Sequence, residues 1–207
     1  MRSLHRRVAL VLGLLLSVIP VLPAVAGPPS DQLKTQIDRV LKTLDDPELK
    51  KEGRGKERRT AVRKIANDIF DFNETARRSL GRHWQARTPA ERDEFVQLFS
   101  DLLERSYISK VELYGGEKIQ YLGDTIDSDQ AKVQTKLLTK GGSDIPIEYR
   151  MSRKGDRWLV YDVIIEGVSL VANYRTQFNK IIQTSSYQEL VKKMKSKQEE
   201  LAAGTTS

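Results

Sequence analysis

Residues 162–175 have the sequence DVIIEGVSLVANYR, and this segment decides the fold because it joins a strand to a helix within a few residues. Residues 158–165 are rich in β-branched and aromatic side chains and predict a strand. Gly167 predicts the end of that strand. Ser169 is suited to cap a helix that continues through Phe178.

The region before this segment predicts an antiparallel sheet. From Glu117 onward, apolar residues alternate with polar ones at a period of two, in runs that contain Ile119, Val133 and Ile145. Gly141-Gly142 and residues 154–156 predict tight connections between these runs. Together with residues 157–165, they predict four strands in an antiparallel meander.

Helical periodicity dominates the first half of the chain. Apolar residues at helical spacing predict helices over residues 33–44 and 62–69, and a short helix over 73–80 that Gly81 closes. Residues 50–59 are charged and predict a loop. Thr88-Pro89-Ala90-Glu91 forms a capping box that begins the longest predicted helix, which runs to the glycines at 115–116.

Two further helices are predicted at the C-terminal end. One spans residues 168–185, and the other opens at Ser186, with Glu189 completing a second capping box. The order of helices, antiparallel sheet and helices predicts an α+β domain. Helices that cover the apolar face of such a meander either fill the space or leave a cavity.

The first 26 residues have the pattern of a cleaved secretory signal. A basic stretch precedes the apolar run from Val8 to Ile19, and Ala24-Val25-Ala26 predicts cleavage after Ala26. We therefore expect export to the periplasm, a single domain over residues 27–201, and a disordered tail over residues 202–207.

Composition narrows the chemistry of the exported chain. Removal of three signal arginines lowers the formal net charge from +7 to +4, which favours anionic headgroups or an acidic partner surface. No stacking-aromatic and arginine motif is present, so no nucleic-acid partner is expected. The chain has no cysteine and, after cleavage, a single histidine, His83. We therefore predict no metal site, no cofactor and no thiol catalysis.

Enzyme signatures are incomplete. Residues 167–171, GVSLV, begin like a nucleophile elbow but lack its final glycine, and no suitable histidine follows. Without a nucleophile and base pair, the sequence predicts a protein that is not an enzyme.

Several of these motifs together resemble the MlaC family, also called the toluene-tolerance auxiliary component. The resemblance covers most of the exported chain and includes LGRHW at residues 80–84, the Thr88-Pro89 cap, Tyr161-Asp162, GVSL at 167–170 and NYR at 173–175. These proteins are periplasmic carriers that move phospholipid between the two membranes of a Gram-negative envelope. Some members are associated with hopanoid lipids.

The resemblance implies an apolar, lipid-sized cavity between sheet and helices that takes the acyl chains of a phospholipid or hopanoid-type lipid. It also implies docking on an outer-membrane lipoprotein complex and on an inner-membrane ABC transporter complex with its substrate-capture subunit. The expected wall consists of the inward strand positions and one face of the following helix: Val133, Leu137, Ile147, Tyr149, Met151, Tyr161, Val163, Ile165, Val168, Val171, Tyr174 and Phe178.

Four points stay open from the sequence. An error of one residue in strand phase would place the other face of each strand inside. Taken one by one, the tyrosines are more simply explained by ordinary core packing, which every domain of this size needs. Asp162 and Arg175 either pair to hold the strand–helix junction, or Arg175 meets a phosphate. A protein-binding adaptor or chaperone without lipid cargo is the competing function.

Overall fold

The computed structural model describes residues 28–112, 114–139 and 141–203. The predicted signal peptide and the last four residues of the predicted tail lie outside this part. The described elements, in chain order, are α1 (Pro28–Asp45), α2 (Gly55–Ile69), α3 (Phe72–Leu80), the 3₁₀ turn η1 (Gly81–His83), α4 (Pro89–Glu112), β1 (Lys118–Asp127), β2 (Gln130–Leu138), β3 (Asp144–Lys154), β4 (Arg157–Ile165), β5 (Val168–Ser169), α5 (Leu170–Thr184) and α6 (Tyr187–Ala203).

The predicted helix starts are confirmed where side chains cap them. Thr88 and Glu91 exchange hydrogen bonds at the start of α4: the Thr88 amide donates to Glu91 Oε2 (2.8 Å) and the Glu91 amide donates to Thr88 Oγ1 (3.3 Å). Ser186 Oγ accepts from the Glu189 amide at the start of α6 (3.0 Å). Helix α4, with 24 residues, is the longest described helix, as predicted.

Other helix boundaries differ from the predictions. Helix α2 begins at Gly55, inside the segment predicted to be a loop. Helix α6 includes the first two residues of the predicted tail. In the described part of the chain, no helix combines the length and the apolar character needed to cross a bilayer.

The antiparallel meander is confirmed, but the prediction of four strands is wrong. The sheet has five strands in the order β1-β2-β3-β4-β5. Glu166 and Gly167 both have positive φ (50° and 81°), which is the geometry of a tight hairpin turn, so the chain reverses and Val168 pairs with Ile165. Gly167 therefore turns the strand rather than ending it, and α5 begins at Leu170, two residues later than predicted.

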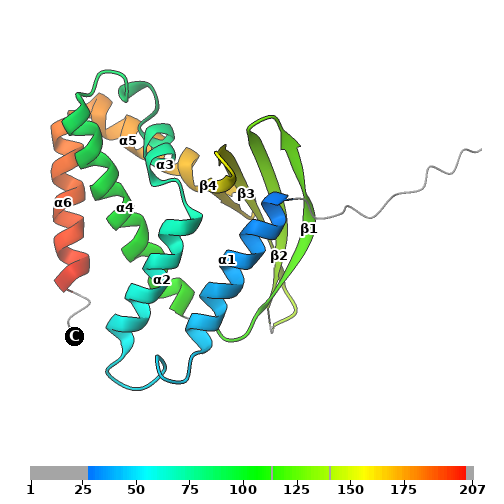
Figure 1. Ribbon diagram of the computed structural model, residues 1–207. Coiled ribbons are helices and arrows are strands. Elements are labelled where there is room, and N and C mark those ends of the chain that lie inside the picture. Colours follow the sequence, from blue (N-terminus) through cyan, green and yellow to red (C-terminus); the bar gives the residue numbers. More distant parts are fainter. Residues whose placement is uncertain (1–27, 113, 140, 204–207) are drawn as a thin grey trace, which may run out of the picture.

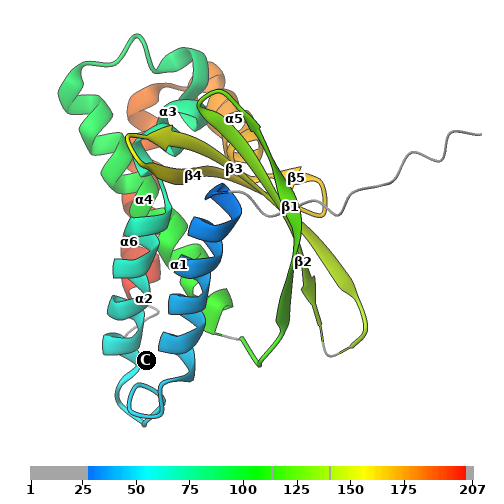
Figure 2. The same ribbon diagram turned by 45° about the vertical axis from the view of Figure 1, so that its right-hand side comes forward.

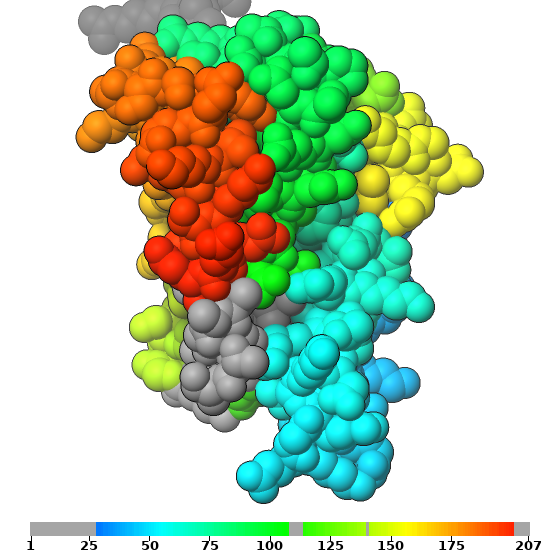
Figure 3. All heavy atoms as spheres, turned by 90° about the vertical axis from the view of Figure 1, so that its left-hand side faces the viewer, coloured from blue at the N-terminus to red at the C-terminus, as the bar shows by residue number. Residues whose placement is uncertain are grey.

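The elements pack in two groups that meet at β4. Helix α1 lies against the sheet with α2 beside it, and α4 and α6 lie side by side farther from the sheet (Figures 1 and 2). Helices α3 and α5 contact each other and β4. The space-filling view shows α4 and α6 forming one continuous outer face, with α2 projecting below it (Figure 3).

The buried apolar residues form two separate clusters in the described part of the chain. The sheet cluster lies between the sheet and the first two helices and contains Leu33, Ile65, Ile69, Ala131, Val133, Met151, Trp158 and Val160. The helical cluster lies among α3, α4, α5 and α6 and contains Ala76, Leu80, Phe95, Leu98, Phe99, Leu103, Phe178, Tyr187, Leu190, Val191 and Met194. A domain of this size usually has one contiguous core, so the division is informative.

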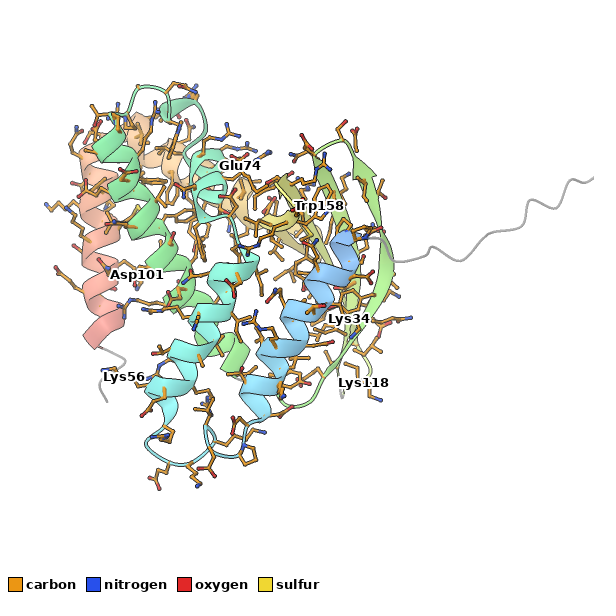
Figure 4. All side chains as sticks on the ribbon, viewed as in Figure 1. Lys34, Lys56, Glu74, Asp101, Lys118 and Trp158 are labelled. Carbon is orange, nitrogen blue, oxygen red and sulfur yellow. The ribbon has the colours of Figure 1, made fainter. Side chains whose placement is uncertain are left out.

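The sheet cluster occupies only one end of the sheet face. Strand register places side chains of this face in rows across β2, β3 and β4. The row Ala131, Met151, Val160 is fully buried (3%, 1% and 0% exposed). Trp158 lies at this same end, beside the start of α1 (Figure 4), where its amide donates to Gln32 Oε1 (2.9 Å).

Burial decreases along the same face toward the other end of the sheet. In the next row, Val133 is fully buried, but Tyr149 and Val163 are half-buried. In the row after that, Thr135 is buried, Ile147 is half-buried and Ile165 is 39% exposed. The helices therefore cover one end of the face completely and the other end only in part.

The strand–helix junction depends on Asp162, which is only 3% exposed. Its carboxylate accepts hydrogen bonds from Ser169 Oγ (2.7 Å) and from the Val171 amide (3.0 Å). Ser169 Oγ in turn accepts from the Ala172 amide (3.0 Å), which confirms Ser169 as the helix cap. Arg150 Nη1 lies 3.8 Å from the same carboxylate.

Of the two alternatives for Arg175, the pairing with Asp162 is wrong. The lone pairs of Asp162 are directed at α5's own first turn and at Arg150 on the neighbouring strand. Arg175 lies one turn farther along α5, where its side chain packs against Gly81: a Cβ atom added there would lie 3.1 Å from Arg175 Cδ.

We predict that Asp162→Ala lowers the free energy of unfolding by about 3 kcal/mol, because two hydrogen bonds to a buried charged acceptor are lost. Ser169→Ala should cost about 1 kcal/mol, the usual value for a lost cap. Urea denaturation measures both. Asp93→Ala, an exposed position on α4, is the control and should change stability by less than about 0.5 kcal/mol. Equal effects at Asp162 and Asp93 would contradict the role of the junction.

A second prediction compares two residues on the same face of β3. Met151→Ala should lower the free energy of unfolding by about 3 kcal/mol, because the site is fully buried and leaves a cavity. Ile147→Ala should cost about 1 kcal/mol or less in protein stripped of lipid, because its side chain is only half-buried. Similar losses for the two variants would show that the face is packed equally at both ends.

Candidate functional site

The partly covered end of the sheet presents a continuous apolar surface, which we call the half-covered face. It is built from β2, β3, β4 and β5 and consists of Leu137, Ile145, Ile147, Tyr149, Val163, Ile165 and Val168. Strand alternation places these side chains on one side of the sheet, the side that carries the buried sheet cluster. The face is thus an extension of the core that the helices leave partly open.

The hairpin between β4 and β5 forms the exposed edge of this face. Ile165 and Val168 pair across the hairpin and are 39% and 62% exposed. Two large apolar side chains side by side at a hairpin tip are unusual on a protein surface. They are the most exposed residues of the face.

Two tyrosines lie toward the buried end of the face. Desolvation raises the pKa of Tyr149 to about 12, partly offset by a hydrogen bond with Thr135. Tyr121 on β1 also has a raised pKa, again chiefly through desolvation. The Tyr121 hydroxyl is buried and has no hydrogen-bond partner among the described residues. A buried hydroxyl without a partner is available to a polar group that enters there.

Two more tyrosines lie on the helical side. Tyr107 on α4 and Tyr174 on α5 pack against the helical cluster without being part of its fully buried set. Desolvation raises the pKa of both, and the two are close enough that Tyr107 contributes to the shift at Tyr174. Aromatic side chains with apolar bodies and polar tips thus come from both groups of elements.

The structure brings together six of the twelve predicted wall residues, all on the half-covered face: Leu137, Ile147, Tyr149, Val163, Ile165 and Val168. Val133 and Met151 lie on the same side of the sheet but within the sheet cluster. On α5, Val171 is buried, Tyr174 borders the helical cluster, and Phe178 is inside it. Contact of any of these residues with lipid stays a prediction.

Tyr161 lies apart from the other predicted wall residues. It is the extra residue of a β-bulge, where Met151 pairs with Val160 and Arg150 pairs with Asp162. The guanidinium of Arg78 stacks over the Tyr161 ring at 3.8 Å. The Tyr161 carbonyl accepts from Thr75 Oγ1 (3.0 Å), so the bulge anchors α3 to the sheet.

The predicted set also omits Ile145, which belongs to the half-covered face, and two β1 residues that extend the same side of the sheet. Ile119 and Tyr121 on β1 pair with Leu137 and Thr135, and Ile145 pairs with Leu137. Strand alternation predicts all three by the same rule as their neighbours. The place of Tyr107 at the edge of the helical cluster has no comparable signal, because periodicity marks it only as part of the apolar stripe.

Two hollows lie outside the half-covered face. One, of about 350 Å³, lies between the start of α1 and the β3–β4 turn; of the predicted wall residues, only Met151 lines it. The other, of about 390 Å³, lies between α5 and the end of α3 with the following turn η1, and it has basic walls. In the described part of the chain, no group of three or more carboxylate and histidine side chains is placed to hold a metal ion.

Comparisons with known proteins agree with this architecture. A chain from Ralstonia solanacearum, described as a phospholipid-binding protein in complex with a phospholipid, superposes with a TM-score of 0.74 and 25% identity, over 84% of this chain and 98% of that one. The intermembrane phospholipid transport system binding protein MlaC of Haemophilus influenzae is 23% identical over 141 residues. The match covers 66% of this chain and 66% of that protein, so this chain spans just under two thirds of that relative's length.

A longer match extends to the toluene tolerance protein ttg2D of Pseudomonas putida, which is 24% identical over 186 residues, 86% of this chain and 82% of that protein. The family model described as MlaC protein matches residues 34–196, from the first helix to the last. This match spans well over half of the chain, and the protein therefore belongs to the MlaC family.

Proposed function

We propose that this protein is a periplasmic carrier that holds the acyl chains of a phospholipid against the half-covered face. The observation that carries the proposal is the partly uncovered apolar surface on β2 to β5, which continues the core and reaches solvent at Ile165 and Val168. The phospholipid complex described for the Ralstonia solanacearum protein supports the same class of ligand.

The two separate apolar clusters support the same conclusion. Half-buried residues border both clusters: Tyr149 and Val163 beside the sheet cluster, and Tyr107, Leu170 and Tyr174 beside the helical cluster. Acyl chains placed along these residues would complete a core that the polypeptide leaves divided. The cargo would thereby stabilise the carrier by binding only the folded state.

The energetics favour exchange with a membrane. Burial of acyl CH₂ groups contributes about 0.8 kcal/mol each, so two chains with about 28 such groups contribute roughly 20 kcal/mol gross. A bilayer offers nearly the same environment, so the net free energy of transfer is small. A carrier therefore requires an apolar surface as large as the acyl chains it covers, and it requires few specific contacts with the headgroup.

The proposed route uses the two membranes of the envelope. Residues 1–26 would direct export and be cleaved after Ala26. The carrier would then dock alternately on an outer-membrane lipoprotein complex and on an inner-membrane ABC transporter complex with its substrate-capture subunit. The names of the relatives in Haemophilus influenzae and Pseudomonas putida support intermembrane phospholipid transport and toluene tolerance as the context.

Native mass spectrometry of the exported chain, purified from a bacterial periplasm without detergent, tests the proposal. We expect one bound phospholipid that is released on denaturation and identified by its fragments. A bound mass that matches a hopanoid would support the same site with a different lipid as cargo. A ligand-free mass, together with no uptake from phospholipid vesicles, would overturn the proposal in favour of a protein-binding adaptor.

A charge at the edge of the face should impair loading. We predict that Ile165→Asp lowers phospholipid uptake from vesicles by at least about tenfold, because the carboxylate would be buried against acyl chains. Since Ile165 is already 39% exposed, the variant should fold normally by circular dichroism.

Leu122→Asp is the matched control. Leu122 is similarly exposed (41%) but lies on β1, at the opposite edge of the sheet from the β4–β5 hairpin. Phospholipid uptake by the Leu122→Asp variant should stay within about twofold of wild type, as for a surface substitution. Equal losses for the two variants would locate the site elsewhere or show a nonspecific effect of the added charge.

A further inference from the structure

The hollow between α3 and α5 has basic walls. Helices α3 and α5 lie side by side (Figures 1 and 2), and the hollow of about 390 Å³ at their junction is lined by Leu80, Arg82, His83, Arg175, Thr176 and Asn179. We call this the basic pocket. It contains the single histidine of the exported chain and two arginines from different elements.

The cationic groups of the basic pocket lack counter-charges. No carboxylate is among the described residues that line it. Within the described part of the chain, neither Arg82 nor Arg175 forms an ion pair, whereas the nearby Arg77 and Arg78 are both paired with Glu74 (2.6 Å each). Two uncompensated guanidinium groups around one hollow create a positive potential that favours an anion.

Neutral contacts hold these side chains in place. Arg82 Nη2 donates to Asn179 Oδ1 (2.8 Å), and His83 Nε2 lies 3.0 Å from the same oxygen. Asn179 Nδ2 donates in turn to Gln183 Oε1 (3.0 Å). The stem of Arg175 rests on Gly81, whose φ of +57° and missing Cβ allow the close approach. The pocket is therefore preorganised before any anion arrives.

The basic pocket lies on a different side of α5 from the proposed lipid site. Tyr174 and Phe178 contact the helical cluster, whereas Arg175, Thr176 and Asn179 line the pocket. Arg82 and Arg175 are both exposed, so an anion can reach them from solvent. The pocket is thus placed to meet an external group and not the headgroup of an interior cargo.

We propose that the basic pocket binds a phosphate group, and that the protein uses it to engage headgroup phosphates at a bilayer surface. Phosphate fits better than carboxylate, because the pocket offers two guanidinium groups and an imidazole, while a carboxylate has only two acceptor oxygens. This inference goes beyond the proposed function and stands whether or not the half-covered face holds lipid.

Titration with inorganic phosphate tests the chemistry of the pocket. The Nε–Hε resonances of Arg82 and Arg175 in the exported protein, assigned with Arg82→Lys and Arg175→Lys, should shift saturably with phosphate. They should not shift with chloride at matched ionic strength. No saturable shift with phosphate would overturn the proposal, and a shift only with a glutamate-rich peptide would assign the pocket to an acidic protein partner instead.

Vesicle cosedimentation tests the bilayer as the source of the phosphate. Arg82→Gln and Arg175→Gln should each weaken binding to phosphatidylglycerol-containing vesicles about tenfold, because a charge-assisted hydrogen bond is lost. Glutamine preserves most of the Arg175 stem on Gly81, so the variants should fold. Lys192→Ala on α6, which also removes one positive charge from an exposed site, is the control and should bind nearly as wild type.

The two measurements separate the possible sources. A saturable phosphate shift with unchanged vesicle binding in both glutamine variants would confirm the phosphate site and overturn the bilayer as its source. Equal weakening by Lys192→Ala would show that only net charge matters and would overturn a specific pocket. Retention of copurified lipid by both glutamine variants would distinguish this site from the proposed cargo site.

Discussion

The carboxylate of Asp162 is the constraint on which the rest of the architecture depends. It is buried on β4 and accepts hydrogen bonds from the cap and first turn of α5, so the helix must begin at the end of the sheet. This places the β4–β5 hairpin, the half-covered face and the inner side of α5 next to one another. A buried carboxylate without these donors would strongly destabilise the fold. Asp162 and the capped first turn of α5 therefore depend on each other.

The division of the core leaves part of one sheet face outside the packed interior. The chain has no disulfides, so packing must hold the helices to the sheet. The two buried clusters do so at separate places, and the β-bulge at Tyr161 joins them by anchoring α3 to β4. Stability is thus concentrated away from the half-covered face, which agrees with its proposed role as the lipid-binding surface.

Helix α5 serves two chemically different surfaces. Its apolar side, with Tyr174 and Phe178, belongs to the interior, and its other side, with Arg175 and Asn179, forms the basic pocket with Arg82 and His83. A carrier that takes up and releases lipid must meet both acyl chains and polar headgroups. One helix that presents an apolar side inward and a cationic side outward is suited to make both contacts at the same time.

The sequence alone determined the class of fold, the helix caps at Thr88, Ser169 and Ser186, and the meander, because periodicity and capping act within a few residues. It also predicted the alternating side chains of the half-covered face. It could not decide the fifth strand, the bulge at Tyr161 or the partner of Asp162. Those depend on which backbone groups and charges meet across the fold, and only tertiary packing determines how far each apolar side chain is covered.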